Sequence, residues 1–310
     1  MEFGLHRDVP AARYHADDLA DVPSLSSSIA KVILNQTPRH AWIGHPRLNP
    51  HFEAGDEAKF DLGSVVHEMV LGRGGGFQVI DAGDYRTKDA KEARARIVSE
   101  GRTPILSHQH DEAVAITGAV LKRLAQIGVT INPSNSEVVG LWQDRGGPVC
   151  RMMIDNLDGP IVYDAKVTSV GLDSGALSRL IGNMGYDLSA GFYLRGLDAL
   201  RPQFAGRWRF RWIFIEADEP HEVRVLEADR TTLEIGDRKA ATAIAKWGRC
   251  MKSGEWPGYP ANVEAIGLTD WAVSSWIGRE ESDEDCRGAA FSSMSRPVER
   301  APLKSVYGAG

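Results

Sequence analysis

The stretch from Val149 to Thr168 reads VCRMMIDNLDGPIVYDAKVT, in which two runs rich in β-branched and aromatic residues flank an Asp-Gly-Pro turn. Such runs on either side of a turn signal predict an antiparallel hairpin. Side chains alternate between the two faces of a strand, so Asp164 and Lys166 of the second run share one face. The hairpin therefore decides how the rest of the chain is interpreted, because it brings Asp155 toward this Asp-x-Lys tripeptide.

The length of the loop fixes which residues of the hairpin face each other. A two-residue loop at Gly159–Pro160, or a four-residue loop at 158–161, would pair Asp155 directly with Asp164, with Cβ atoms about 5 Å apart. A three-residue loop would place them on opposite faces. Two carboxylates this close repel unless a positive charge lies between them. A divalent cation is the economical answer, since hard oxygen ligands suit magnesium or manganese.

The tripeptide Asp-x-Lys occurs three times, beginning at Asp89, Asp164 and Asp237. The first lies in a charged run typical of a solvated helix, and the third leads into an Ala-rich helix. Exposed charges of this kind need no special explanation. Only Asp164 falls in a predicted strand, so we predict that the tripeptide Asp164-Ala165-Lys166 belongs to the active site.

Composition limits the classes of protein to which the chain can belong. With 310 residues and 43% hydrophobic content it can bury one large core or two modest ones. The net charge of −6 argues against a surface coated in basic residues for nucleic-acid binding, although it allows a local basic groove. Arg207, Arg209 and Arg211 alternate with aromatic residues and predict a strand with a basic face. That face either contacts DNA or is merely solvated.

Targeting and redox signals point to the cytoplasm. No stretch approaches the roughly 20 apolar residues that span a membrane, and the N-terminus lacks a signal pattern. The three cysteines, Cys150, Cys250 and Cys286, are widely spaced and form no Cys-x-x-Cys. A structural zinc site and a disulfide framework are therefore not expected.

The order of predicted elements indicates the fold class. Turn signals, charge and periodicity predict helices near residues 29–34, 57–71, 87–94, 107–126, 174–200 and 230–252. Strands are predicted near 136–143, 148–157, 160–168, 207–216 and 222–228. This order predicts an α/β protein with a mixed central sheet flanked by helices. The acidic and then Ser/Pro/Gly-rich end predicts one domain over residues 1–278 and a flexible tail over 279–310.

These motifs, in this order, resemble the PD-(D/E)XK nuclease superfamily and, more narrowly, the nuclease domain of RecE-type exonucleases (exonuclease VIII). The resemblance covers roughly residues 10–275. The segment GSVVH ending at His67 resembles the family's Gly-Ser/Thr-x-x-His helix, and DAKVT from Asp164 resembles its Asp-x-Lys-Thr/Ser strand. The segment YDLSAGFY from Tyr186 resembles a Tyr-x-x-Gln-x-x-x-Tyr helix, with Ser189 in place of the glutamine. Weaker likenesses are Tyr14-His15, the segment 23–28, Cys150-Arg151 and Glu255-Trp256-Pro257.

The resemblance implies roles for residues that spacing alone leaves ambiguous. It implies a Mg²⁺ site, with Mn²⁺ able to substitute, whose ligands are His67, Asp155, Asp164, the Ala165 carbonyl and Glu137. Lys166 would orient the attacking water or stabilise charge on the phosphate. Without the resemblance, His67 would be an ordinary helix histidine and Glu137 an exposed strand residue. Tyr186 and Tyr193 would either contact DNA or pack in the core.

The implied activity is digestion of linear double-stranded DNA from its ends, 5′ to 3′, which leaves 3′ single-stranded tails for recombination. Relatives implied by the resemblance form ring-shaped homo-oligomers, and a RecT-like single-strand annealing protein would be the partner. Two alternatives stay open. One is another nuclease of the same fold, such as an endonuclease or a repair or CRISPR-associated enzyme. The other is an inactive DNA-binding scaffold.

Overall fold

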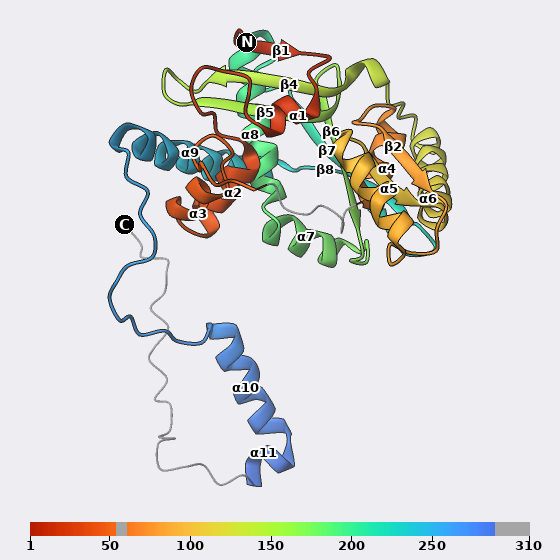
Figure 1. The fold of residues 1–310 in the computed structure, drawn as a ribbon. Helices are drawn as coiled ribbons and strands as arrows, with labels where there is room; N and C mark the ends of the chain where they lie inside the picture. Colours follow the sequence, from red (N-terminus) through yellow and green to blue (C-terminus); the bar gives the residue numbers. More distant parts are fainter. Residues whose placement is uncertain (54–60, 289–310) are drawn as a thin grey trace. The chain divides into compact units, whose positions relative to one another are not determined.

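A computed structural model describes residues 1–53 and 61–288 (Figure 1). The chain divides into two compact units, Met1–Tyr259 and Pro260–Gly310. The division falls before the predicted boundary at Gly278, because residues 260–269 run exposed between prolines and a helix that starts at Asp270. The predicted start of the helix at residue 57 lies outside the described residues.

The larger unit is built on a six-stranded sheet of order β1-β4-β5-β6-β7-β8. Neighbouring strands are antiparallel except β6 and β7, which run parallel and are connected through helices. A separate parallel pair joins β2 and β3. The strands are β1 (Gly4–His6), β2 (Phe77–Ile80), β3 (Thr103–Leu106), β4 (Ser136–Gln143), β5 (Val149–Asp158), β6 (Ile161–Thr168), β7 (Arg209–Glu216) and β8 (Val223–Glu227).

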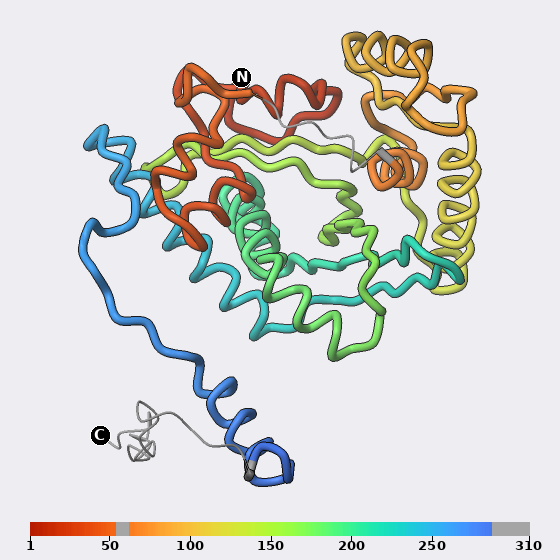
Figure 2. Tube along the Cα trace, turned by 60° about the horizontal axis from the view of Figure 1, so that its bottom comes forward, coloured from red at the N-terminus to blue at the C-terminus, as the bar shows by residue number. Residues whose placement is uncertain are grey.

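Helices cover both faces of the large sheet, which confirms the predicted mixed α/β architecture (Figure 1). Helices α2, α8 and α9 pack together on one face, where Figure 2 shows α2 beside α8. Helices α4 and α6 lie on the other. The helices are α1 (Ala11–His15), α2 (Ser27–Asn35), α3 (Pro38–Ile43), α4 (Asp61–Leu71), α5 (Lys88–Ser99), α6 (Ser107–Gln126), α7 (Ser174–Asn183), α8 (Tyr186–Leu200), α9 (Arg230–Ser253), α10 (Asp270–Ser282) and α11 (Glu284–Gly288).

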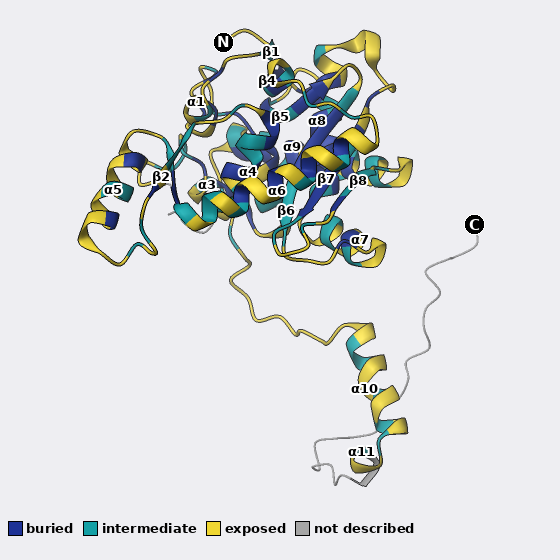
Figure 3. Cartoon of the chain, turned by 90° about the vertical axis from the view of Figure 1, so that its right-hand side faces the viewer, coloured by how far each residue is buried: buried dark blue, intermediate teal, exposed yellow. Residues whose placement is uncertain are grey.

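Strand β7 contributes side chains to the hydrophobic cores on both faces of the sheet. Phe210, Trp212 and Phe214 pack toward α8 and α9, whereas Ile213 and Ile215 pack toward α4 and α6. All five are at most 1% exposed, and burying each such side chain stabilises the fold by roughly 1.5–3 kcal/mol. The central strands are accordingly the most buried part of the molecule, as Figure 3 shows. Because these strands are fixed from both sides, they can hold side chains at set positions.

A buried ion pair fastens the N-terminal segment to β5. The Asp17 carboxylate, 0% exposed, lies 2.8 Å from Arg151 Nη1 and accepts a 2.9 Å hydrogen bond from the Ser24 amide. His45 Nε2 lies 3.1 Å from the Ser24 carbonyl oxygen. Removing one partner of such a buried pair typically costs about 3–5 kcal/mol. This network fixes the segment that leads directly into α2.

The predicted helix over residues 174–200 is wrong in one respect, since it is two helices. Helix α7 ends at Asn183 and α8 begins at Tyr186. Between them Gly185 has φ of +62°, a left-handed conformation that ends a right-handed helix. The short strands β1, β2 and β3 were not predicted, because runs of three or four residues carry too little alternation to be recognised.

No helix in the part of the chain that the structure describes is long and apolar enough to cross a membrane.

The crossing of α8 and α9 depends on glycine. A Cβ atom added at Gly191 would lie 2.2 Å from the Gly236 backbone. We expect Gly191→Ala to lower the free energy of unfolding by about 1–3 kcal/mol, because the helices must move apart. The matched control is Gly118→Ala in the middle of α6, where an added Cβ meets nothing within 4 Å. That change should raise stability by up to about 1 kcal/mol. Equal urea midpoints for the two variants would contradict the packing account.

Candidate active site

The β5–β6 hairpin has a two-residue loop, which is one of the two loop lengths that the sequence left open for pairing Asp155 with Asp164. Asp158 pairs with Ile161, so the loop is Gly159–Pro160, and Gly159 has φ of +56° at the position where tight hairpins need it. The ladder ends at Asn156 and Tyr163. That is one pair before Asp155 and Asp164 would face each other, so the strands part at the two carboxylates.

The Asp155 side chain accepts a backbone hydrogen bond just beyond the end of the β5–β6 ladder. Its Oδ2 accepts a 2.8 Å hydrogen bond from the Ala165 amide and lies 3.0 Å from His67 Nε2 of α4. Burial would raise the pKa of the Asp155 carboxyl, but nearby positive charge and hydrogen bonds from His67 and Ala165 lower it to about 2. Burial would lower the pKa of His67, and the Asp155 carboxylate outweighs it, so this pKa is raised. The two side chains form an ion pair whenever His67 is protonated.

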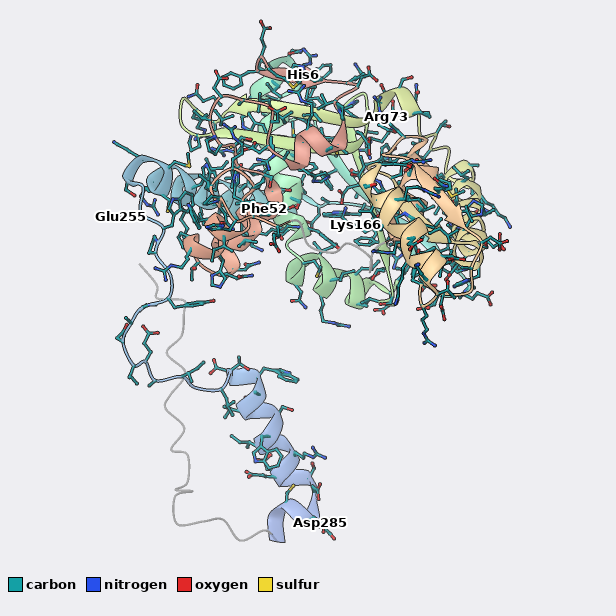
Figure 4. The ribbon with its side chains drawn as sticks, in the orientation of Figure 1. His6, Phe52, Arg73, Lys166, Glu255 and Asp285 are labelled. Carbon is teal, nitrogen blue, oxygen red and sulfur yellow. The ribbon has the colours of Figure 1, made fainter. Side chains whose placement is uncertain are left out.

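Asp164 and Lys166 form the second half of the centre, in which Lys166 is labelled in Figure 4. Lys166 Nζ lies 2.7 Å from Asp164 Oδ2 and donates a 3.1 Å hydrogen bond to the Ala165 carbonyl oxygen. Burial and the Asp155 charge raise the pKa of Asp164 above its ordinary value. The carboxylates outweigh burial at Lys166, so its pKa is raised too. The Lys166 ammonium is therefore the positively charged partner of the buried Asp164 carboxylate.

Glu137 reaches the same centre through an unusual backbone conformation. Glu137 has φ of +51°. It forms no pair in the β4–β5 ladder, although its neighbours Ser136 and Val138 do. Burial raises the pKa of its carboxyl, and the charge of His67 partly offsets this. Left-handed backbone at a residue other than glycine costs about 1–3 kcal/mol and gathers at functional sites. The structure thus brings Glu137 together with His67 and Asp155.

The donor atoms at this centre suit a hard divalent cation. In residues 1–53 and 61–288 no three His, Cys, Asp or Glu side chains already meet as a metal cluster. His67 contacts Asp155, and Lys166 contacts Asp164. The side chains and backbone gathered here nevertheless supply carboxylate oxygens, a carbonyl oxygen and an imidazole nitrogen, which are donor types that small divalent cations bind. These residues therefore fit the metal that the sequence predicts.

A second lysine, which sequence reasoning missed, borders the site. Lys31 Nζ of α2 lies 5.7 Å from the centre of the Tyr186 ring, and Lys166 Nζ lies 5.6 Å from the same ring. Burial, then Lys166, lowers the pKa of Lys31, and burial raises the pKa of Tyr186. The only sequence signal for Lys31 was its place among apolar residues of an amphipathic helix. Tyr186, predicted as a DNA contact or a packing residue, lies beside Lys166.

The predicted DNA contact at Tyr193 is not supported by its position. Tyr193 is 9% exposed and packs against Phe210, with ring centroids 6.2 Å apart. Burial raises the pKa of its hydroxyl far above the ordinary value. The α8 face that carries Tyr193 is the inner face of the core. Ser189, on the same helix, is likewise only 8% exposed.

The predicted basic face of β7 lies away from the carboxylates. Arg209 and Arg211 pair with Glu227 of β8 at 2.6 and 2.9 Å. Arg211 also donates a hydrogen bond to the Tyr163 hydroxyl, and Tyr163 points to the opposite face of β6 from its neighbour Asp164. Arg207 precedes the strand. The structure therefore does not bring these arginines to the site, because Glu227 neutralises two of them on the other face.

The other two Asp-x-Lys tripeptides lie on helices, as predicted. Asp89 and its lysine are exposed on α5. On α9, Asp237 pairs with Arg195 at 2.9 Å and Lys239 pairs with Asp187 at 2.5 Å. Both tripeptides therefore lie on helices and not on a strand of the sheet.

One of two similar solved structures supports the fold. A crystal structure from Eubacterium rectale described as a "Putative exonuclease" matches with a TM-score of 0.57 at 12% identity, covering 87% of this chain and 99% of that one. A "phage related exonuclease" from Haemophilus somnus matches with a TM-score of 0.32 at 10% identity, covering 77% and 99%. No curated protein sequence matches.

A family model matches residues 48–269, which is more than half of the chain and includes His67, β5 and β6. Its description names the fold class to which the observed sheet, the paired carboxylates and Lys166 also point. The chain belongs to the family described as "PDDEXK-like domain of unknown function (DUF3799)".

Proposed function

We propose that this chain is a divalent-metal-dependent deoxyribonuclease that digests linear duplex DNA from its ends. The family and the fold support a nuclease. The observation that carries the proposal is the meeting of Asp155, Asp164 and Lys166 where β5 and β6 part. A phosphodiester hydrolase needs oxygen ligands for a metal and a cation for the phosphate, and this centre holds both kinds of group.

Each residue has a task that follows from its position. Asp155, Asp164, His67 and the Ala165 carbonyl, with Glu137 nearby, would hold the ion. When bound, the ion polarises the phosphate and lowers the pKa of a bound water. The Ala165 amide fixes the orientation of Asp155. Asp164 holds the Lys166 ammonium in place, from which it can stabilise negative charge that develops on the phosphate.

The finer assignment rests on the resemblance to RecE-type exonucleases. It comprises 5′-to-3′ polarity, 3′ tails for single-strand annealing, Mg²⁺ as the natural ion and Mn²⁺ as a substitute. It also comprises a ring-shaped homo-oligomer around DNA and a RecT-like partner. An endonuclease of the same fold and an inactive scaffold are the competing assignments, and the experiments below separate all three.

The catalytic centre can be tested against a matched copy of its own motif. We expect Asp164→Asn and Lys166→Met each to reduce cleavage of a labelled duplex by at least about 10²–10³-fold, because charge at the reacting phosphate is lost. DNA binding measured by fluorescence anisotropy should remain within a few-fold of wild type. Asp89→Asn and Lys91→Met, which change the exposed tripeptide on α5, should cleave like wild type.

Near wild-type cleavage by the Asp164 or Lys166 variant would remove the site assignment. A wild-type protein that binds duplex DNA but never cleaves it would favour the inactive scaffold.

Metal dependence should appear in binding as well as in activity. We expect EDTA to abolish cleavage and added Mg²⁺ or Mn²⁺ to restore it, because carboxylate and imidazole donors suit both ions. Calorimetric titration of Mn²⁺ should show binding by wild type and by Asp89→Asn. Binding should be lost in Asp155→Asn, whose wild-type carboxylate lies beside both His67 and Ala165. Unchanged Mn²⁺ affinity in Asp155→Asn would place the metal elsewhere.

Substrate topology separates an exonuclease from an endonuclease. We expect linear duplex to be digested and covalently closed circles to resist. The rate of initiation should fall steeply with salt. A protein that makes 6–10 phosphate contacts loses roughly 10³–10⁵ in DNA affinity between low and moderate salt. Labelling each strand end in turn measures polarity. Rapid cutting of closed circles would transfer the assignment to an endonuclease of this fold.

A further inference from the structure

Lys31 is held in place by a glycine and an aromatic ring. Its side chain crosses Gly185, where an added Cβ would lie 2.9 Å from Lys31 Cδ. Gly185 has φ of +62° at the start of α8. The ammonium group then lies over the ring of the next residue, Tyr186, at 5.7 Å from its centre. The break between α7 and α8 thus provides Gly185, which leaves room for the Lys31 alkyl chain, and Tyr186, whose ring lies under the Lys31 ammonium group.

The two lysines at this ring differ in their partners. Lys166 Nζ, 5.6 Å from the Tyr186 ring centre, contacts the Asp164 carboxylate at 2.7 Å. For Lys31 no carboxylate comes within ion-pair distance in the described residues, and the charged groups that act on it most are Lys166, which repels it, and Asp164. The ring supplies only a modest attraction, about 0.5–2 kcal/mol for a cation–π contact.

A half-buried ammonium beside a second ammonium is unfavourable for the fold alone. Burial removes water from the charge, and like charges close together raise the cost further. An anion that enters between these lysines offsets both effects. In the proposed reaction the DNA strand carries one negative charge per nucleotide, spaced about 3.4 Å along the helix axis per strand. A strand whose scissile phosphate lies at Lys166 must therefore bring a neighbouring phosphate near.

We propose that Lys31 binds a phosphate of the cut DNA strand adjacent to the scissile phosphate, with Tyr186 as the platform shared by Lys31 and Lys166. The proposal rests on the proposed nuclease function and adds a second substrate contact to it. Lys31 binds substrate and takes no part in the bond-breaking step. The competing explanation is that Lys31 only packs its alkyl stem against Gly185 and keeps its charge in water.

Substitution separates the two explanations. We expect Lys31→Met, which keeps most of the apolar stem, to raise KM about tenfold, as loss of a charged contact does, with kcat nearly unchanged. The slope of log KM against log salt should become shallower by about one unit, the signature of one lost phosphate contact. Lys31→Arg should retain the contact. The matched control is Lys122→Met, which removes the same charge from the exposed face of α6.

Chemically altered DNA locates the contact. In substrates with one uncharged methylphosphonate linkage, wild type should lose affinity when the neutral linkage lies next to the scissile one. Lys31→Met should be insensitive at that linkage and remain sensitive at others. Tyr186→Leu removes the ring under both ammonium groups and should weaken binding in the way that Lys31→Met does.

The outcomes distinguish failure of the Lys31 proposal from failure of the nuclease proposal. If wild type cleaves and Lys31→Met matches Lys122→Met in KM and salt slope, the Lys31 assignment is overturned while the nuclease assignment stands. If wild type does not cleave but Lys31→Met lowers the salt slope of DNA binding in an anisotropy titration, Lys31 binds phosphate and the nuclease assignment fails. Absence of both cleavage and a Lys31-dependent salt slope overturns both.

Discussion

The hydrogen bond from the Ala165 amide to the Asp155 carboxylate is the interaction on which the site depends. Beyond Asn156 and Tyr163 the β5–β6 ladder ends, and the carboxylate satisfies a backbone N–H that would otherwise be left without a partner. The strands can therefore part without losing that hydrogen bond. Their parting directs Asp155 toward His67 of α4 and places Asp164 with Lys166 beside it. A Lewis-acid centre and a phosphate-binding cation can then be built from one short hairpin.

The surrounding fold holds this opening from both sides. Helix α4 is fixed against α6 by a closed apolar core, so His67 approaches the hairpin from one face. On the other face α2 and α8 bring Lys31 and Tyr186. The buried Asp17–Arg151 pair fastens the segment before α2 to β5, the strand that also carries Asp155. The position of Lys31 is thus coupled to the strand that carries Asp155.

Sequence reasoning succeeded where local rules decide and failed where distant partners decide. The hairpin loop, the strands and the helical positions of the other Asp-x-Lys copies follow from alternation and turn residues. The place of His67 came only from a family resemblance, because helix α4 and β5 are far apart in sequence. Arg209 and Arg211 looked free because Glu227 arrives from the next strand. Lys31 was missed for the same reason, since its role depends on a glycine break far along the chain.

We propose that Asp155, Asp164 and His67 hold a divalent ion where β5 and β6 part. The most direct measurement is a crystal structure of the protein soaked in Mn²⁺, with the ion located by its anomalous scattering. We expect a peak bonded to oxygens of both aspartates and to the imidazole, at ligand distances of roughly 2.0–2.2 Å, as for a small divalent cation. A peak elsewhere, or a hairpin with Asp155 and Asp164 on opposite faces of the sheet, would contradict it.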